Sequence, residues 1–421
     1  MPLRCVTAIA PAEEGGKAKM KKPNTTAPEA ARRRFLGGMA FGAATLAASR
    51  SFAAGGTDAH ATGYDVSAAS NVMQTVPRKP GEAAAFTFGL DTNPVKATTG
   101  GWAREVTARS LPLSTDLAGA HLYMNPGGSR EMHWHTSDEW AFILGGQCQV
   151  AVLDPSGEVD VANYGPGDLW FFPKGHAHGI FTLGDQPCHA ILVFSDGLYS
   201  ERGTFGLSDW LSRYDAATLS RNFGVQAASF AGFPQGETYI NQGAVIPLDS
   251  AAARGVHELP PARSHRYRLM AGKPWRSFSG GTLHLASARE FPVTGITALI
   301  IRLRPGGMQE LHWHPNANEW FYVSKGQVRA TLFTADKHMA VANLSAGDCG
   351  YFPRGWGHSL EATGSDDCEV ISALDSGVFL ESSLSEWIAK VPRHMLVNNL
   401  HTTEEVLAQF PRRKMGIVGG A

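Results

Sequence analysis

The sequence has no apolar run long enough to span a bilayer and no excess of charge of either sign. Hydrophobic residues make up 43% of the 421 positions, but no stretch approaches the roughly 20 apolar residues that a membrane-spanning helix needs. The 37 basic and 38 acidic residues leave a net charge of −1. This balance argues against the basic surface typical of nucleic-acid-binding proteins. We therefore expect no nucleic-acid partner and, for the mature chain, no membrane contact.

Cysteine is also scarce. The chain has five cysteines and no C-x-x-C pair, so a cysteine-based metal or redox motif is not indicated. Cys188 and Cys368 each stand just before an apolar segment, at matching points of two similar regions. We expect both to be small buried hydrophobic residues, and the sequence leaves open whether any cysteines pair.

Glycine and proline are abundant, with 47 and 24 residues. Many of them separate short apolar or alternating segments such as 139–144, 147–153, 190–194, 283–286 and 296–302. Short strands divided at this spacing by turn residues are typical of an antiparallel sandwich or small barrel.

One stretch combines this pattern with residues that suit a metal ion. It reads R-E-M-H-W-H-T-S-D-E-W from Arg130, and G-D-L-W-F-F-P-K-G-H-A-H follows further on. Side chains at i and i+2 of a strand share a face, so His133 and His135 point to the same side while Trp134 points away. A turn after His135 lets Glu139 open the next strand, and a later strand returns His178. Three imidazoles and a carboxylate suit a divalent transition metal with positions left open.

The stretch occurs a second time, as Q-E-L-H-W-H-P-N-A-N-E-W and G-D-C-G-Y-F-P-R-G-W-G-H. A single H-x-H is usually a solvated strand face, but two copies with both halves in order favour a functional reading. The sequence therefore predicts a second site at His312, His314, Glu319 and His358.

These segments resemble the two signature motifs of the cupin superfamily, G-x5-H-x-H-x3,4-E-x6-G and G-x5-P-x-G-x2-H. Besides the eight ligands, the matching positions are Gly127, Gly146, Gly167, Pro173 and Gly175 in the first copy and Gly306, Gly326, Gly347, Pro353 and Gly355 in the second. Two such copies with H-W-H and E-W in both resemble the bicupin oxalate decarboxylase family. The resemblance covers nearly all of the chain after about residue 80. It implies an all-β fold of two jelly-roll β-barrels with attached α-helical hairpins.

The resemblance also implies an activity. Manganese ions, two per chain, would lie at the two ligand sets. Monoanionic oxalate would bind at the first, and dioxygen would act as a cofactor for its conversion to formate and carbon dioxide. The second site would bind metal for structural reasons or electron relay, and the family forms hexamers. Oxalate oxidase, which yields carbon dioxide and hydrogen peroxide, is the nearest alternative, and a non-enzymatic metal-binding bicupin is another. The ligands alone would also accept iron, nickel or zinc.

The two copies differ three residues before the histidines, where the first has Arg130 and the second has Gln309. A guanidinium beside a metal can hold an anionic oxygen by paired hydrogen bonds and polarise a carboxylate. In the family the first-domain arginine contacts the substrate, and the second site commonly has an arginine too. We therefore expect catalysis at the first site and doubt it at the second.

A second difference is a loop. The segment from Gly197 to Trp210 is three residues longer than the matching one from Gly377 to Trp387. The extra residues fall within Ser200, Glu201, Arg202, Gly203 and Thr204. In the family this position holds a mobile lid, typically Ser-Glu-Asn-Ser-Thr, whose glutamate donates the proton. Ser200, Glu201 and Thr204 match, while Arg202 and Gly203 depart, and this departure keeps the oxidase alternative open.

The chain can be divided into four parts. Residues 1–53 resemble a twin-arginine signal peptide, with Arg32-Arg33-Arg34-Phe35-Leu36 before a Gly/Ala-rich run, and predict export to the periplasm or the medium. Residues 54–85 form a linker or arm. The two cupin domains cover 86–233 and 239–421. Helical patterns follow Gly203 (Leu207, Trp210, Leu211, then Leu219) and begin at Leu384 (with Trp387 and Ile388), and a C-terminal helix begins near Thr402-Thr403-Glu404-Glu405.

Overall fold

The computed structural model describes residues 85–335 and 337–420. The expected signal peptide and almost all of the expected linker lie outside these residues. Among the helices described, none is long and apolar enough to cross a membrane.

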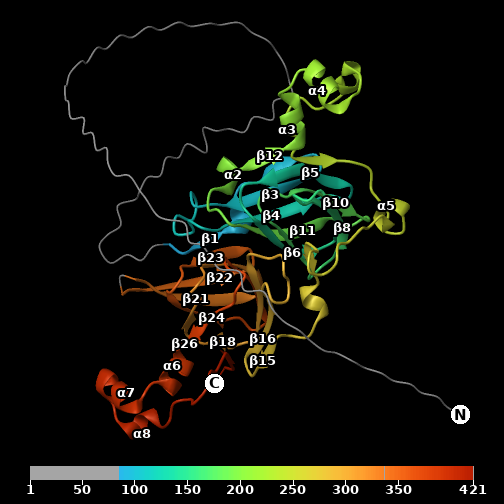
Figure 1. Ribbon diagram of the computed structural model, residues 1–421. Coiled ribbons are helices and arrows are strands. Elements are labelled where there is room, and N and C mark those ends of the chain that lie inside the picture. The colour runs from blue at the N-terminus through green and yellow to red at the C-terminus, as the bar shows by residue number, and fades with distance from the viewer. Residues whose placement is uncertain (1–84, 336, 421) are drawn as a thin grey trace, which may run out of the picture. The chain divides into compact units, whose positions relative to one another are not determined.

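The first barrel consists of two antiparallel sheets that face each other (Figure 1). One has the order β14-β9-β6-β11-β4-β3-β2, with strands at Arg266–Tyr267, Leu169–Phe172, Glu139–Gly145, Cys188–Phe194, Ala118–Met124, Gly101–Val106 and Lys96–Thr98. The other has the order β12-β5-β10-β7-β8, with strands at Thr204–Gly206, Gly128–His135, Ala177–Leu183, Gln147–Leu153 and Val159–Tyr164. A further strand, β13 (Ile240–Gln242), pairs with β5.

The second barrel repeats this architecture. One sheet has the order β1-β23-β20-β25-β17-β16-β15, with strands at Thr87–Gly89, Asp348–Phe352, Glu319–Lys325, Cys368–Leu374, Thr297–Leu303, Gly281–Ala286 and Arg276–Phe278. The other has the order β22-β21-β24-β18-β27, with strands at Met339–Ser345, Gln327–Phe333, Gly357–Ala362, Met308–Gln309 and Ile417–Val418. Two short strands, β19 (His312–Trp313) and β26 (Ser382–Ser383), pair with each other, and β19 also pairs with β24. The expected two-barrel fold is confirmed.

The motif glycines make the turns between these strands. All eight have a positive φ, from 70° at Gly146 and Gly306 to 98° at Gly347. At Gly146, between β6 and β7, a Cβ would also fall 2.1 Å from the carbonyl oxygen of Pro187. Only glycine adopts this conformation without strain and leaves room for the close approach of the neighbouring backbone. The glycine spacing of the motif is therefore a requirement of the barrel hairpins.

The strands divide between the barrels at other boundaries than those expected from the sequence. β1, assigned to the first domain, pairs with β23 of the second barrel. β13 and β14, assigned to the second domain, pair with β5 and β9 of the first. The chain thus enters the second barrel after Tyr267 rather than at residue 239. A sequence pattern marks a strand but not its partner, so these pairings were not visible in it.

The helices lie outside the sheets (Figure 1) and follow the expected order with differences in length. They span Tyr199–Arg202 (α2), Leu207–Ser212 (α3), Ala216–Phe223 (α4), Ala251–Arg254 (α5), Leu384–Lys390 (α6), Arg393–Leu400 (α7) and Glu404–Leu407 (α8), with 3-10 turns at Leu90–Thr92, Ala227–Phe230 and Leu269–Ala271. The predicted cap is present, because the Thr403 hydroxyl accepts a hydrogen bond from the Val406 amide. α7 was not predicted.

The apolar faces of α3 and α6 are not buried as an amphipathic pattern suggests. Leu207 and Trp210 on α3 are 39% and 52% exposed, and Trp387 on α6 is 58% exposed. Leu219 on α4 is buried. Large exposed apolar side chains of this kind are typical of surfaces that contact another chain.

Each barrel has an apolar core, and a third cluster joins the two. It brings Trp140 and Ile191 of the first barrel together with Trp320, Tyr351 and Ile371 of the second. The four described cysteines are buried and free: Cys148, Cys188, Cys349 and Cys368. The expectation of small buried hydrophobic residues at Cys188 and Cys368 is confirmed.

Candidate metal centres

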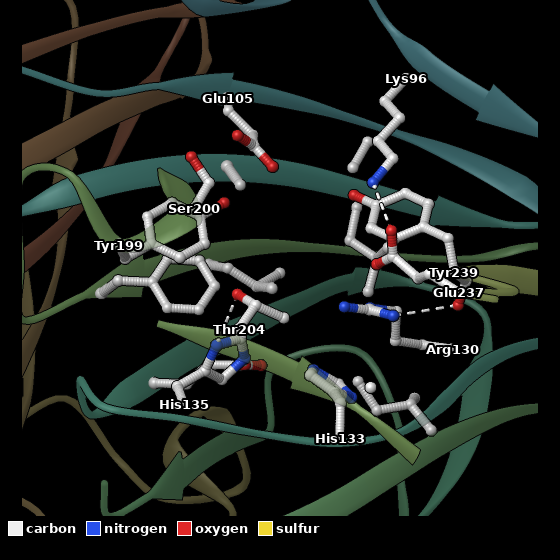
Figure 2. Close-up of a pocket in the computed structure, with 18 of the residues that line it drawn as sticks. Lys96, Glu105, Arg130, His133, His135, Tyr199, Ser200, Thr204, Glu237 and Tyr239 are labelled. Atoms are coloured by element: carbon white, nitrogen blue, oxygen red, sulfur yellow. Dashed lines mark hydrogen bonds and ion pairs between the residues drawn. The ribbon is translucent and has the colours of Figure 1, made fainter. Parts of the chain in front are cut away.

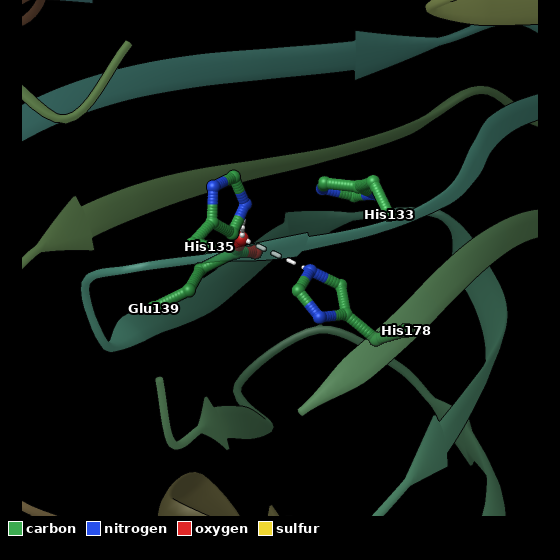
Figure 3. Close-up of side chains that lie close together, drawn as sticks. All are labelled: His133, His135, Glu139 and His178. Atoms are coloured by element: carbon green, nitrogen blue, oxygen red, sulfur yellow. Dashed lines mark ion pairs between the residues drawn. The ribbon is translucent and has the colours of Figure 1, made fainter. Parts of the chain in front are cut away.

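The first four predicted ligands meet inside the first barrel (Figure 3). His133 and His135 lie on β5, Glu139 opens β6 after the bend at residues 136–138, and His178 on β10 pairs in register with His133. All four side chains are buried, and the candidate ligand atoms lie within 4.8 Å of one another. The alternation predicted from H-W-H is confirmed, since Trp134 points away and stacks on Phe205.

The hydrogen bonds of the three imidazoles prepare them for a metal ion. The Nδ1 atoms of His133 and His178 lie 2.6 and 2.9 Å from the carbonyl oxygens of Glu131 and His176. His135 Nδ1 lies 3.1 Å from the Thr204 hydroxyl. A carbonyl can only accept, so Nδ1 carries the proton in His133 and His178, and their Nε2 lone pairs face the cluster. Nδ1 bonds of this kind orient histidine ligands in metal sites.

Glu139 completes the cluster as an anion. Its Oε2 lies 3.0 Å from His135 Nε2 and 3.3 Å from His178 Nε2, and its Oε1 accepts a hydrogen bond of 3.0 Å from Trp170 Nε1. Burial raises the pKa of Glu139, but the interactions of its carboxylate with His178 and His135 outweigh burial and lower the pKa. Burial lowers the pKa of His133 well below its usual value, so this imidazole stays neutral. A carboxylate among neutral imidazole lone pairs fits a divalent transition metal.

The second set forms the same arrangement. His312, His314, Glu319 and His358 are buried, with ligand atoms again within 4.8 Å. The Nδ1 atoms of His312, His314 and His358 lie 2.7 to 2.8 Å from the carbonyl oxygens of Glu310, Leu380 and Trp356. Both carboxylate oxygens of Glu319 are buried with no hydrogen-bonding partner. An unsatisfied buried carboxylate is costly, and a cation there would remove that cost.

A cavity of about 210 Å³ lies above the first centre. Figure 2 shows Arg130, Tyr239 and Glu237 on one side, Tyr199 and Ser200 on the other, and His133 and His135 below. Arg130 is only 7% exposed. Its Nη1 donates a hydrogen bond of 3.1 Å to the Tyr239 carbonyl, and its guanidinium carbon lies 4.4 Å from the centre of the Tyr239 ring. The cavity can hold a small anion between the guanidinium and the metal ligands.

The expected lid borders this cavity. Residues 199–202 form the single helical turn α2, and Thr204 begins β12, so the segment is more regular than the loop that we expected. Ser200 and Thr204 line the cavity. The side chains of Glu201 and Arg202 lie outside the described residues, so the proton-donor role of Glu201 stays a prediction.

Sequence reasoning missed several residues around Arg130. Tyr239 has a positive φ of 57° and supplies both the carbonyl and the ring that hold Arg130. Glu131, also buried, accepts hydrogen bonds from the amides of Thr238, Tyr239 and Ser208 and so fixes that backbone. The second barrel has a buried carboxylate at the matching position, Glu310, which follows Gln309. This repetition was the one signal in the sequence that could have pointed to Glu131.

Two further charged groups line the cavity. Lys96 lies 3.2 Å from Glu237 and 3.7 Å from the centre of the Tyr239 ring, and Glu105 lies on the wall near Tyr199. Nothing in their sequence neighbourhood marks them, because β2, β3 and the segment before β13 meet only in the folded barrel.

A protein-family model described as Cupin matches residues 88–229 and 269–406 of this chain. The chain belongs to the cupin family. Among curated proteins, it is 34% identical to the oxalate decarboxylase of Bacillus subtilis (strain 168) over 341 residues, 80% of this chain and 88% of that protein. It is 33% identical to a probable oxalate decarboxylase of Arthroderma benhamiae over 326 residues, 76% of this chain and 79% of the relative. The resemblance to the bicupin oxalate decarboxylases is thereby confirmed.

Comparison with solved structures shows the same similarity. A structure of the Bacillus subtilis oxalate decarboxylase at pH 4.6 matches with a TM-score of 0.76 and 32% identity, covering 81% of this chain and 89% of the other. A second, from a study of the Mn(II) centres of that enzyme, matches with a TM-score of 0.75 over 81% of this chain and 90% of the other. Each of these matches therefore spans both barrels of this chain.

Proposed function

We propose that this bicupin is a manganese-dependent oxalate decarboxylase that acts at its first centre. One observation supports this most: a complete ligand set lies beneath a small cavity whose wall carries a buried arginine. The two curated relatives described above are named as an oxalate decarboxylase and a probable oxalate decarboxylase, and one matched structure concerns the Mn(II) centres of the Bacillus subtilis enzyme. When bound, manganese together with dioxygen as cofactor would supply the one-electron chemistry that weakens the carbon–carbon bond.

The chain's own groups account for recognition of the substrate. Monoanionic oxalate, HC2O4−, gives carbon dioxide and formate, so one C–C bond breaks and one C–H bond forms without net oxidation. Arg130, held by Tyr239, offers a planar pair of donors that can bind one carboxylate and draw electron density from it. Burial of the arginine strengthens this interaction, because little water competes for the guanidinium.

A proton must then reach the carbon that loses carbon dioxide. The Nδ1 protons of His133 and His178 are engaged outside the cluster, and a guanidinium is too weak an acid, with a pKa above about 12. Glu201 is on α2, the helical turn that borders the cavity through Ser200. We assign it the role of general acid, with closure of the segment excluding water.

Oxalate oxidase is the second candidate. It would share the centre and the substrate but consume dioxygen and a proton to yield two carbon dioxides and hydrogen peroxide. Arg202 and Gly203, which depart from the family's lid, are the reason to consider it. The deciding experiment incubates the manganese-loaded protein with oxalate and measures both products. Formate equal to the oxalate consumed supports the decarboxylase, peroxide in that amount supports the oxidase, and neither product would favour a non-enzymatic bicupin.

Two further proposals concern the setting of the enzyme. The exposed apolar side chains on α3 and α6 support a homo-oligomer, and the family resemblance suggests a hexamer; light scattering coupled to gel filtration would measure the mass.

The Arg32-Arg33 segment supports twin-arginine export to the periplasm or the medium. Replacing both arginines by lysine should retain the protein in the cytoplasm, which cell fractionation would detect.

A further inference from the structure

The wall of the second centre differs from that of the first at three positions. Gln309 replaces Arg130; its Nε2 lies 3.3 Å from His312 Nε2, and its buried Oε1 has no hydrogen-bonding partner. Gly416 occupies the position that matches Tyr239. Its amide donates a hydrogen bond to Glu310, just as the Tyr239 amide donates one to Glu131. The second centre therefore lacks both the guanidinium and the aromatic ring that supports it.

The third difference places an acid beside the second centre. In the first barrel Thr204 pairs with His135. In the second, Ser383 pairs with His312 and Ser382 with Trp313, which sets Glu381 opposite His314. The preceding carbonyl of Leu380 holds His314 Nδ1 at 2.8 Å, so the backbone here is fixed. A carboxylate thus stands where the first centre has a small neutral hydroxyl.

Glu381 is buried and has its own counter-ion. Its side chain is only 8% exposed, and it forms an ion pair with Lys414. The Lys414 ammonium pairs directly with its carboxylate, so the group carries its negative charge beside the second ligand set. Lys414 lies just before Met415 and Gly416, whose amides are bound by Glu310. The ion pair is therefore supported on both sides by backbone that the barrel holds in place.

We propose that Glu381, positioned by Lys414, is a resident anion that closes the second centre to external carboxylates. An entering anion would meet a fixed negative charge and would find no arginine to bind it. Like charges at close range in a poorly solvated site repel strongly, so the difference in affinity between the centres should be large. The inference rests on the second ligand set holding a metal, but not on the identity of the reaction at the first.

The test uses formate as the probe and electron paramagnetic resonance of Mn(II) as the readout. In the full-length protein with both ions, formate should perturb the signal of the first ion alone. In a His135→Ala chain, which keeps only the second ion, formate should leave the spectrum unchanged. Glu381→Gln in that background should make the remaining ion respond to formate, while Lys414→Arg should not. Glu361→Gln is the matched control, because Glu361 is a more exposed carboxylate paired with Arg329 on the same barrel.

Glu381→Thr, which copies the first centre, repeats the test if the glutamine variant does not fold. A response of the second ion to formate in the unaltered chain would show an open centre and overturn the inference. So would a second ion that stays unresponsive in both Glu381 variants, or a chain whose second ligand set takes no ion. If the expected pattern is found but oxalate is not decomposed, the proposed function fails and the closed second centre stands.

Discussion

Arg130 and Gln309 occupy matching positions in the two barrels, three residues before the first histidine ligand. Arg130 is held at its Nη1 by the Tyr239 carbonyl, which leaves the rest of the planar guanidinium available to an anion. Arg130→Lys would keep the charge but lose the paired donors. We expect turnover to fall by on the order of a hundredfold, about 2.7 kcal/mol of transition-state stabilisation.

Gln309→Ala is the matched control for this change and should alter turnover little. Steady-state assays of formate release from oxalate compare the two variants. A greater loss with Gln309→Ala would move the catalytic site to the second barrel.

Glu201 is the only carboxylic acid in the lid segment from residue 200 to 204. Glu201→Gln keeps the size and polarity of the side chain but removes its proton, so formate production should collapse while the metal content stays unchanged. If dioxygen captures the unprotonated carbon instead, peroxide per oxalate consumed should rise. Parallel formate, peroxide and metal determinations test this. Undiminished formate production would show that another group supplies the proton.

His135 is a ligand of the first centre only. The purified protein should contain close to two divalent ions per chain, because both ligand sets are complete. His135→Ala removes one of three imidazoles and should abolish activity and release one ion. Elemental analysis with inductively coupled plasma mass spectrometry measures the loss. Unchanged metal content in this variant would contradict the assignment.

At the scale of elements, Asp160 on β8 ties the segment that connects the barrels to the first of them. Its carboxylate accepts hydrogen bonds from the amides of Leu259 and His265 and lies 2.9 Å from His265 Nδ1. Burial raises the pKa of Asp160, but these hydrogen bonds and the imidazole outweigh it and lower the pKa. The carboxylate therefore contributes stability that is complete above its unfolded pKa of about 3.9 and is lost as pH falls through the lower folded value.

We expect Asp160→Asn to destabilise the protein by about 1–3 kcal/mol at pH 7, since one buried donor loses its partner. Below about pH 4, the stability of the variant should also fall less steeply than that of the unaltered protein, because asparagine has no carboxylate to protonate. Urea unfolding at pH 7 and at about pH 2 measures both effects. Equal losses at the two pH values would mean that the charge of Asp160 contributes nothing.

At the scale of the whole molecule, the crossing strand β1 and a shared apolar cluster join the two barrels. β1 completes a sheet of the second barrel, whereas all strands of the first barrel lie within residues 96–267. The second barrel is therefore not built from one continuous segment, and its sheet depends on chain that precedes the first barrel. At Gly119 a Cβ would lie 2.0 Å from the Trp320 ring, so even one methyl group forces the barrels apart. The barrels should therefore unfold in a single transition.

Gly119→Ala should lower the stability of both barrels together, by at least the roughly 1–3 kcal/mol typical of overpacking. Gly232→Ala is the control, because a Cβ there meets no atom within 4 Å. Differential scanning calorimetry should show one transition in each protein, shifted to lower temperature only in Gly119→Ala. Two separate transitions in the unaltered chain would show that the barrels are independent.

The sequence alone determined the parts of this protein that depend on neighbours in the chain. Strand alternation put His133 and His135 on one face, the motif glycines marked the hairpins, and the repetition of the motif indicated two barrels and both ligand sets. These features could be predicted because each rests on backbone geometry within a few residues. The predicted strand 147–153 has the bounds observed, and others differ by one or two residues at an end.

Only the tertiary structure decided which distant segments meet. Tyr239 reaches Arg130 across 109 residues, Lys414 reaches Glu381 at the second centre, and β1 crosses to the other barrel. The register of long-range pairing sets these contacts, and a single residue's shift would turn each side chain to the opposite face. That register follows from packing of the whole barrel, which no local pattern of residues contains.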